Sequence, residues 1–173
     1  MLINIKATTN IEILGYVSPF RATPLEKLRE FCEAVSELGL LKGEWKDQVV
    51  YDLGCGDGIV NVELAKLFGT RGVGLDLDES LVAKANELAE SQQVSHIVSF
   101  LKQDIFTTDY SDATILFMYL LPEALEKLKS VLESFLLLGD KLLVIEMWKP
   151  SNWEEKEIYV HDKGVFRVYG NKK

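Results

Sequence analysis

An acidic residue and three alternating glycines form the segment with the clearest chemical meaning, Asp52-x-Gly54-x-Gly56-x-Gly58. The segment follows a short apolar run and precedes a helical pattern. Glycine lets the backbone turn sharply and lets a ligand approach the main chain closely. Spacing of this kind between a strand and a helix predicts a loop that binds a small molecule.

The residue types in this loop narrow the ligand class. A dinucleotide-binding loop would place its third glycine at position 59, which is Ile59, and a phosphate-binding loop would end in Gly-Lys-Ser or Gly-Lys-Thr. The acid Asp52 would repel a pyrophosphate but suits a positively charged ligand. S-adenosylmethionine (SAM) carries an ammonium and a sulfonium group, so we predict that Asp52 lies near its methionine part, directly or through water.

Two further acids follow predicted strands. Asp76 ends the second strand, where a carboxylate can accept hydrogen bonds from both ribose hydroxyls; the alternative is a solvated acid in a turn. Asp104 follows the third strand, where it would accept from the adenine amino group while Ile105 or Phe106 packs on the ring. The alternative for Asp104 is a helix cap or a turn residue.

The acceptor of a methyl group would approach after the fourth predicted strand. Tyr119, Leu120 and Leu121 stand at this place. Tyr119 either lines a channel for the acceptor or simply packs against its neighbours.

The elements that position these residues alternate between strands and helices. Short apolar runs bounded by turn residues predict strands at 49–53, 72–77, 97–101, 113–118, 141–146, 156–160 and 165–169. The alternation predicts an α/β fold with a doubly wound, mostly parallel seven-stranded sheet. Residues 161–164 predict the turn of an antiparallel hairpin formed by the last two strands.

Helical patterns cover 24–38, 59–68, 79–91 and 122–138. The first helix is predicted to begin at Pro24, with Thr23 as its N-cap and Glu26 completing a capping box. Gly39 ends this helix.

Composition excludes several classes of protein. The chain has 173 residues, 47% of them hydrophobic and 27% charged, which predicts one globular domain over 1–173 with residues 1–23 as an N-terminal arm or lid. A formal net charge of −8 argues against direct binding to nucleic acid and favours a basic partner; the alternative is that the charge only keeps the protein soluble. Two cysteines and two scattered histidines predict no metal site. The absence of a signal peptide or a spanning apolar segment predicts a cytoplasmic protein.

The motifs resemble those of class I SAM-dependent methyltransferases across most of the chain. A narrower resemblance joins three segments to a small family of protein-lysine methyltransferases. Residues 19–24 look like its P-[YF]-x-x-T-P signature, residues 50–58 resemble its VYDLGCGDG segment, and residues 113–122 resemble its strand-four region. This family includes archaeal enzymes that methylate chromatin proteins and the mitochondrial enzyme that methylates the ATP synthase c subunit.

The resemblance implies a Rossmann-like fold, SAM as cofactor and a protein substrate. It also implies that Phe20 and Thr23 help to cover the cofactor. The cofactor-binding residues predicted from motif and resemblance together are Phe20, Thr23, Asp52, Gly54, Cys55, Gly56, Gly58, Asp76, Leu77, Asp104 and Ile105.

Three departures from the family pattern weaken the transfer of its substrate specificity. Ile59 stands where the family often has a basic residue, and residues 144–147 read Val-Ile-Glu-Met where the family often has Ser-His-acid-Phe. Trp153 stands about one residue later than the tryptophan that follows the fifth strand in the family. The motifs of the cofactor site are unaffected.

A lysine acceptor must lose a proton before methylation, since its ordinary pKa is about 10.4. We predict that Tyr119 and Glu146 form the mouth of the acceptor site, with Trp148 or Trp153 nearby, and that Glu146 attracts the ammonium. The alternatives are a plain strand-end acid for Glu146 and edge packing for the tryptophans. The predicted partner is a basic protein, and the chain is expected to be a monomer or a weak dimer.

Two rival functions stay open. One is a methyltransferase for a small molecule or a nucleic acid, although the [DN]-P-P-[YF] segment typical of enzymes acting on base amines is replaced by Met118-Tyr119-Leu120-Leu121. The other is a SAM-binding scaffold without catalytic activity.

Overall fold

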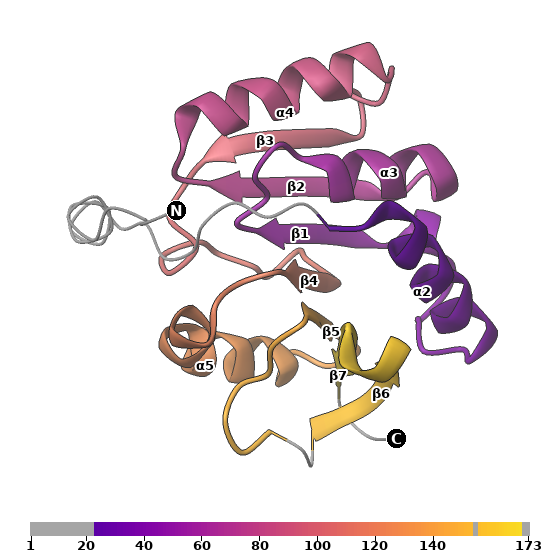
Figure 1. The fold of residues 1–173 in the computed structure, drawn as a ribbon, viewed down its shortest axis with the longest axis vertical. Coiled ribbons are helices and arrows are strands. Elements are labelled where there is room, and N and C mark those ends of the chain that lie inside the picture. Colours follow the sequence, from indigo (N-terminus) through magenta and orange to yellow (C-terminus); the bar gives the residue numbers. More distant parts are fainter. Residues whose placement is uncertain (1–22, 154–155, 171–173) are drawn as a thin grey trace, which may run out of the picture.

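The structure is a computed structural model that describes residues 23–153 and 156–170. In these residues seven strands form one sheet in the order β3-β2-β1-β4-β5-β7-β6 (Figure 1). The strands are β1 Val49–Leu53, β2 Arg71–Asp76, β3 Val98–Lys102, β4 Ile115–Met118, β5 Leu142–Glu146, β6 Glu157–His161 and β7 Phe166–Tyr169. The predicted strands are all present, with ends that differ by one or two residues.

Strands β1 to β5 run parallel, whereas β7 pairs antiparallel with both β5 and β6. The predicted mostly parallel sheet with an antiparallel C-terminal hairpin is therefore confirmed. The chain order reverses between β1 and β4, and in open α/β sheets a ligand binds at the carboxyl ends of the strands beside such a switch point.

The helices cover both faces of the sheet. They are α2 Leu25–Glu37, α3 Ile59–Phe68, α4 Glu79–Ser91 and α5 Pro122–Leu136, with short 3₁₀ turns η1 Trp45–Asp47 and η3 Asp162–Gly164. In Figure 1, α4 lies along β3 and α3 along β2. None of the helices in the described ranges is long and apolar enough to span a membrane.

Strands β1, β4 and β5 each contribute to two cores, because parallel strands are buried on both faces. All four residues of β4 are buried. Leu116 and Met118 point into the core formed with α5, whereas Ile115 and Phe117 point into the core formed with α2 and α3. This alternation decides which strand-end side chains share a face.

The predicted capping box at the first helix is wrong. The helix begins at Leu25, Pro24 occupies the N-cap position, and no side chain caps the helix. The reason is that the Thr23 hydroxyl donates to the Glu146 carboxylate instead. A hydrogen bond from this donor stabilises the buried carboxylate by more than the missing cap destabilises the solvent-facing helix end. The reason is that burial removes the water that would otherwise solvate the carboxylate.

Candidate functional site

The glycine loop after β1 is held to β2 by its own backbone. The amides of Gly54 and Cys55 both donate to the Leu75 carbonyl, at 2.8 and 3.0 Å. Gly54, Gly56 and Gly58 have φ values of +79°, +55° and +78°, a region that glycine adopts without strain. The loop therefore turns across the carboxyl ends of β1 and β2, as the spacing predicted.

Gly58 shows why one of these glycines is required for packing as well as for conformation. A Cβ built there would lie 2.6 Å from the Phe100 ring and 2.7 Å from Cβ of Ala85. Gly58 is also the N-cap of α3. Absence of a side chain thus lets the first turn of α3 reach β3 and α4.

The side chain of Cys55, a residue of this loop, packs into the core cluster that contains Phe100 and Ala85, and burial raises the pKa of its thiol. The thiol donates to the Gly56 carbonyl of the same loop at 3.8 Å. Both cysteines of the chain, Cys32 and Cys55, are buried and free.

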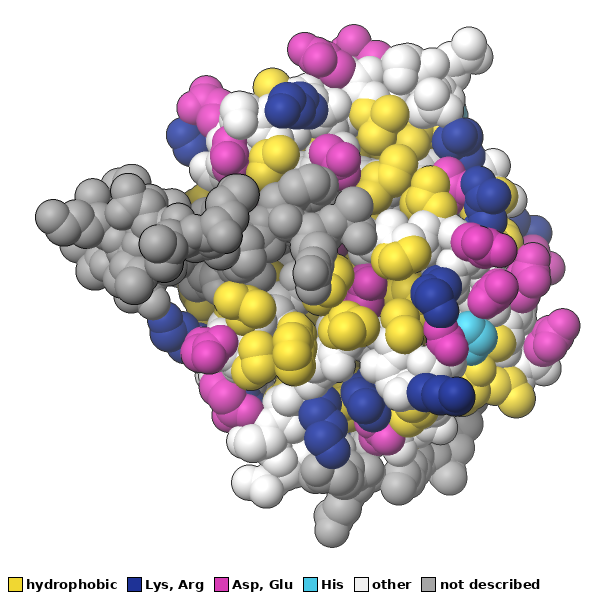
Figure 2. All heavy atoms as spheres, in the orientation of Figure 1, with side chains coloured by type: hydrophobic (Ala, Val, Ile, Leu, Met, Phe, Trp, Pro, Cys, Tyr) yellow, Lys and Arg dark blue, Asp and Glu magenta, His cyan; other side chains and the backbone are white. Residues whose placement is uncertain are grey.

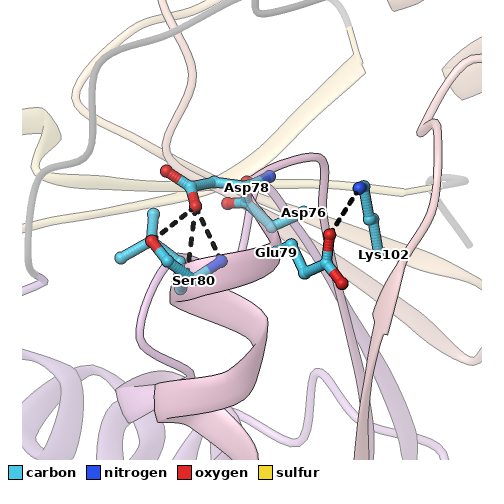
Figure 3. A network of polar contacts seen from close by, with 6 residues as sticks. Asp76, Asp78, Glu79, Ser80 and Lys102 are labelled. Atoms are coloured by element: carbon cyan, nitrogen blue, oxygen red, sulfur yellow. Dashed lines mark hydrogen bonds and ion pairs between the residues drawn. The ribbon is translucent and has the colours of Figure 1, made fainter.

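Asp76 connects the end of β2 to the loop. Its carboxylate accepts from the Gly56 amide at 3.0 Å and from the Asp78 amide at 2.9 Å. Asp78 in turn caps α4 through bonds to the Ser80 and Leu81 amides. Figure 3 shows Asp76 beside this cap, with the Glu79–Lys102 ion pair on the neighbouring turn. The half-buried Asp76 carboxylate is therefore fixed by backbone donors on both sides.

Leu77 directly follows β2 and is half-buried. Its position next to Asp76 places it at the same edge of the sheet.

Asp104 follows β3 and takes part in a tight turn. Its carboxylate accepts from the Phe106 amide at 2.8 Å, and its carbonyl accepts from the Thr108 hydroxyl at 2.8 Å. This is the geometry of the turn alternative. Ile105 is buried in the core on the α5 side, whereas Phe106 is half-buried.

Asp52 and Glu146 share one face of the sheet. Asp52 pairs in register with Phe117, which pairs with Val144, and Glu146 lies two residues beyond Val144 on the same side. Both carboxyl groups are buried, with 4% and 1% of the residue exposed. The two chain segments therefore bring acids from β1 and β5 to one end of the sheet.

This burial changes the ionisation of both groups. Loss of hydration raises the pKa of Asp52 well above its usual range, and the charges of Asp76, Glu146 and Asp57 add to the effect. Burial also raises the pKa of Glu146 to about 7, although the hydrogen bond from Thr23 opposes the rise. The end of the sheet thus crowds carboxyl groups together, and a cationic ligand would favour their ionised forms.

The edge after β4 and β5 combines residues that are far apart in the chain. The Thr23 hydroxyl donates to Oε2 of Glu146 at 2.6 Å across 123 positions of sequence. Tyr119 is half-buried and follows Met118, and Met118 pairs with Ile145, the residue before Glu146. Tyr119 and Glu146 thus each come one residue after a paired position, at the carboxyl ends of β4 and β5, and their role at the mouth of an acceptor site stays a prediction.

The two tryptophans differ in their surroundings. Trp153 is 1% exposed and packs edge-on against Tyr169 in the core on the α5 side. Trp148, with Met147, is partly exposed directly after Glu146. Figure 2 shows hydrophobic side chains gathered near the middle of this view, among interspersed charges.

Phe20 lies outside the described residues, as does most of the predicted arm at 1–23. Within the described part of the chain, no three His, Cys, Asp or Glu side chains are grouped in a way that would hold a metal ion.

Sequence reasoning missed the bond between Thr23 and Glu146. It assigned Thr23 to a local cap, because nothing in the pattern relates residue 23 to the end of β5. It also missed the close approach of Leu120 to Gly54, where a Cβ on the glycine would lie 3.0 Å from the leucine side chain. Strand periodicity contained one usable signal, since it places Asp52 and Glu146 on the same face once the pairing is known.

Comparison with known proteins agrees with this geometry. The model of the ANTKMT methyltransferase domain matches residues 52–157. A protein-lysine N-methyltransferase of Saccharolobus islandicus (strain REY15A) is 31% identical over 147 residues, which cover 84% of this chain and 86% of the relative. A ribosomal protein L11 methyltransferase of Alkaliphilus oremlandii is 30% identical over 91 residues, 53% of this chain and 29% of that protein.

A solved structure resembles nearly the whole chain. The crystal structure of an RNA methyltransferase from Salinibacter ruber, in complex with S-adenosylhomocysteine, has a TM-score of 0.71 and 29% identity. The match covers 86% of this chain and 91% of that one. S-adenosylhomocysteine is what SAM becomes after it has given up its methyl group.

Proposed function

Because the chain belongs to the ANTKMT methyltransferase domain family, and is therefore a SAM-dependent methyltransferase, we propose that its methyl acceptor is the side-chain amine of a lysine in a protein. The observation that carries this proposal is the buried carboxyl of Glu146 at the carboxyl end of β5, the strand next to the one that Tyr119 follows. A carboxylate in such a place suits a cationic amine. The similarity to a protein-lysine N-methyltransferase over most of both chains supports it.

The residues at the carboxyl ends of β1 and β2 fit SAM. Asp52 lies in a crowd of buried negative charge, which an ammonium and a sulfonium would offset. Each carboxylate oxygen has two lone pairs, so Asp76 can accept from ribose hydroxyls while it keeps its two backbone donors. We assign Asp52 to the methionine part of the cofactor and Asp76 to the ribose.

The remaining contacts of the cofactor follow from position. We assign Asp104 to the adenine amino group and Phe106, the more exposed of the two neighbours, to the face of the ring. Gly54, Gly56 and Gly58 allow the backbone to approach the cofactor, and Phe20 covers it. Ile105 and Cys55 support the site from the cores behind it.

SAM supplies the activated methyl group, so the protein mainly orients the acceptor. In this proposal Tyr119 lines the path of the lysine side chain, and Glu146 attracts its ammonium. The net charge of −8 favours a basic protein as substrate. We propose that the chain acts as a single domain, as a monomer or a weak dimer.

The proposal is tested by incubating the purified protein with methyl-labelled SAM and three acceptor pools: basic proteins, RNA and small molecules. Label recovered as methyl-lysine after digestion of the protein pool supports it. Label confined to RNA or to small molecules would contradict the lysine acceptor and leave the methyltransferase assignment intact. Asp76→Ala serves as the control for SAM-dependent labelling.

A further inference from the structure

The environment of Glu146 differs from that of a plain strand-end acid. It is the last residue of β5, it is 1% exposed, and Oε2 accepts the Thr23 hydroxyl at 2.6 Å. Among the described residues, no donor reaches Oε1. One oxygen of a buried carboxylate is thus held by a single neutral donor, while the other accepts no hydrogen bond from the described residues.

Thr23 is itself held in place by the packing of α2. It is 6% exposed and precedes Pro24, whose φ is fixed by its ring. Phe31 of α2 stacks on Phe166 with the ring centroids 4.8 Å apart, and Phe166 is the residue of β7 that pairs with Glu146. The helix and the carboxylate are therefore anchored to the same strand.

We propose that the Glu146 carboxylate takes the proton that a lysine ammonium must lose before methylation, and that Thr23 is the positioning residue that fixes the carboxylate for this step. The inference rests on the proposed lysine acceptor and deepens it. It also changes the role of Thr23, which the resemblance had implied to be a cover for the cofactor.

The step balances in atoms and charge. An N–H bond of the ammonium breaks, its electron pair stays on nitrogen, and an O–H bond forms on Glu146. The neutral amine then forms a bond to the methyl carbon of SAM, and the electrons of the C–S bond leave with sulfur to give S-adenosylhomocysteine. The product is a methylammonium, and Glu146 returns its proton to solvent.

The groups around Glu146 support a proton acceptor that works near neutral pH. An efficient general base has a pKa close to the working pH, and burial raises the pKa of Glu146 to about 7. The titratable group that faces it from β1 is Asp52, and Tyr119 follows β4. On β7, Glu146 faces the apolar Phe166, and His161 of β6 lies one strand further away. The cation on α2, Lys27, is paired with Asp162.

Thr23→Val is the decisive variant, because it keeps the shape of the side chain and removes the hydroxyl. Loss of this donor raises the pKa of Glu146, so the acidic limb of the pH–rate profile should move to higher pH by about one pH unit. Methyl-lysine formation in the basic protein pool, at saturating SAM, should fall about tenfold near pH 6.5. It should recover to within about twofold near pH 9, where the carboxylate is ionised again.

Matched variants separate this role from a structural one. Thr23→Ser keeps the hydroxyl and should restore the wild-type profile. Thr70→Val makes the same change at a buried threonine whose hydroxyl has no partner among the described residues, and should leave the pH–rate profile unchanged.

Glu146→Gln should slow the reaction about a hundredfold at neutral pH, with the affinity for SAM unchanged. Glu63→Gln changes an equally buried glutamate, which pairs with Arg29 of α2, and should leave the rate unchanged.

A second readout does not depend on turnover. With S-adenosylhomocysteine bound, carbon NMR of labelled glutamate carboxyls should show one group that titrates near neutral pH, absent in Glu146→Gln and displaced upward in Thr23→Val. A uniform loss of rate at every pH in Thr23→Val would overturn the inference, as would an acidic limb that survives in Glu146→Gln. If the wild type forms no methyl-lysine, the proposed function itself fails, which is a different result.

Discussion

The edge of the sheet after β1, β2 and β3 is built in a different way from the edge after β4 and β5. At the first edge, Asp76 is held by two backbone amides that lie close to it along the chain or in the adjacent loop. At the second, Glu146 is held by one side chain from residue 23. A site made from backbone tolerates changes in neighbouring side chains, whereas a site made from distant side chains depends on the packing between them.

The difference also appears in burial. Asp76 is half-buried and bonded by amides, while Glu146 is almost fully buried with a single neutral donor, and burial raises its pKa to about 7. Such an environment suits a group that changes its protonation state during a reaction. In the proposed function, Asp76 at the first edge binds the cofactor and Glu146 at the second takes the proton of the lysine.

The largest expected effect is at the glycine loop. Gly58→Ala should lower the free energy of unfolding by about 4 kcal/mol, because the left-handed backbone becomes strained and the new Cβ meets the Phe100 ring. Urea denaturation measures it. Gly39→Ala is the control, since its φ of +61° is similar but no atom lies within 4 Å of the new Cβ. Equal losses in both variants would show that packing at the loop contributes nothing.

Asp76→Ala should weaken SAM binding by a few hundredfold, because it removes the ribose acceptor and the anchor of the Gly56 amide. Calorimetry with SAM measures the affinity. Asp78→Ala should instead cost about 1 kcal/mol of stability through the lost cap of α4, with little change in affinity. An Asp76 variant that binds SAM normally would contradict the division between the two edges.

The pH dependence of stability should reveal Glu146. Its pKa in the folded protein, about 7, lies above the ordinary 4.5, so the folded state holds this proton more tightly between those values. The free energy of unfolding contributed by this group therefore falls as pH rises through that window, by about 3 kcal/mol. Denaturation of wild type and Glu146→Gln at about pH 4.5 and about pH 7.5 tests it. The two proteins would respond alike to pH if burial of Glu146 were unimportant.

The smallest effect is expected at Thr70. Its hydroxyl is buried and has no hydrogen-bond partner among the described residues, so Thr70→Val should raise the free energy of unfolding by about 1 kcal/mol. Thermal unfolding is the measurement. A loss of stability there would mean that the hydroxyl has an acceptor after all, and Thr70 would no longer be a fair match for Thr23.

Much of the fold was predictable because its signals are local. Apolar runs and glycine positions located each strand to within one or two residues, and the alternation with helices predicted the parallel sheet. The glycine loop and Asp76 were predictable for the same reason, since their contacts lie within one β-strand–loop–helix unit and its neighbour.

The first helix shows where local reasoning fails. Thr23, Pro24 and Glu26 form a good capping signal, yet Thr23 bonds to Glu146 and the helix has no side-chain cap. A local pattern describes which partners are near in the chain. It contains no information about a stronger partner that arrives only when β5 and α2 pack together.

The sequence by itself determined the class of the fold, the cofactor loop and the acids that follow the strands, because these depend on periodicity and on the backbone freedom of glycine. Only the tertiary structure decided that Thr23 and Glu146 meet, that Cys55 and Ile105 turn into the cores, and that Trp153 packs against Tyr169. The physical reason is that burial and pairing between distant segments depend on how the layers pack, which no short stretch of sequence records.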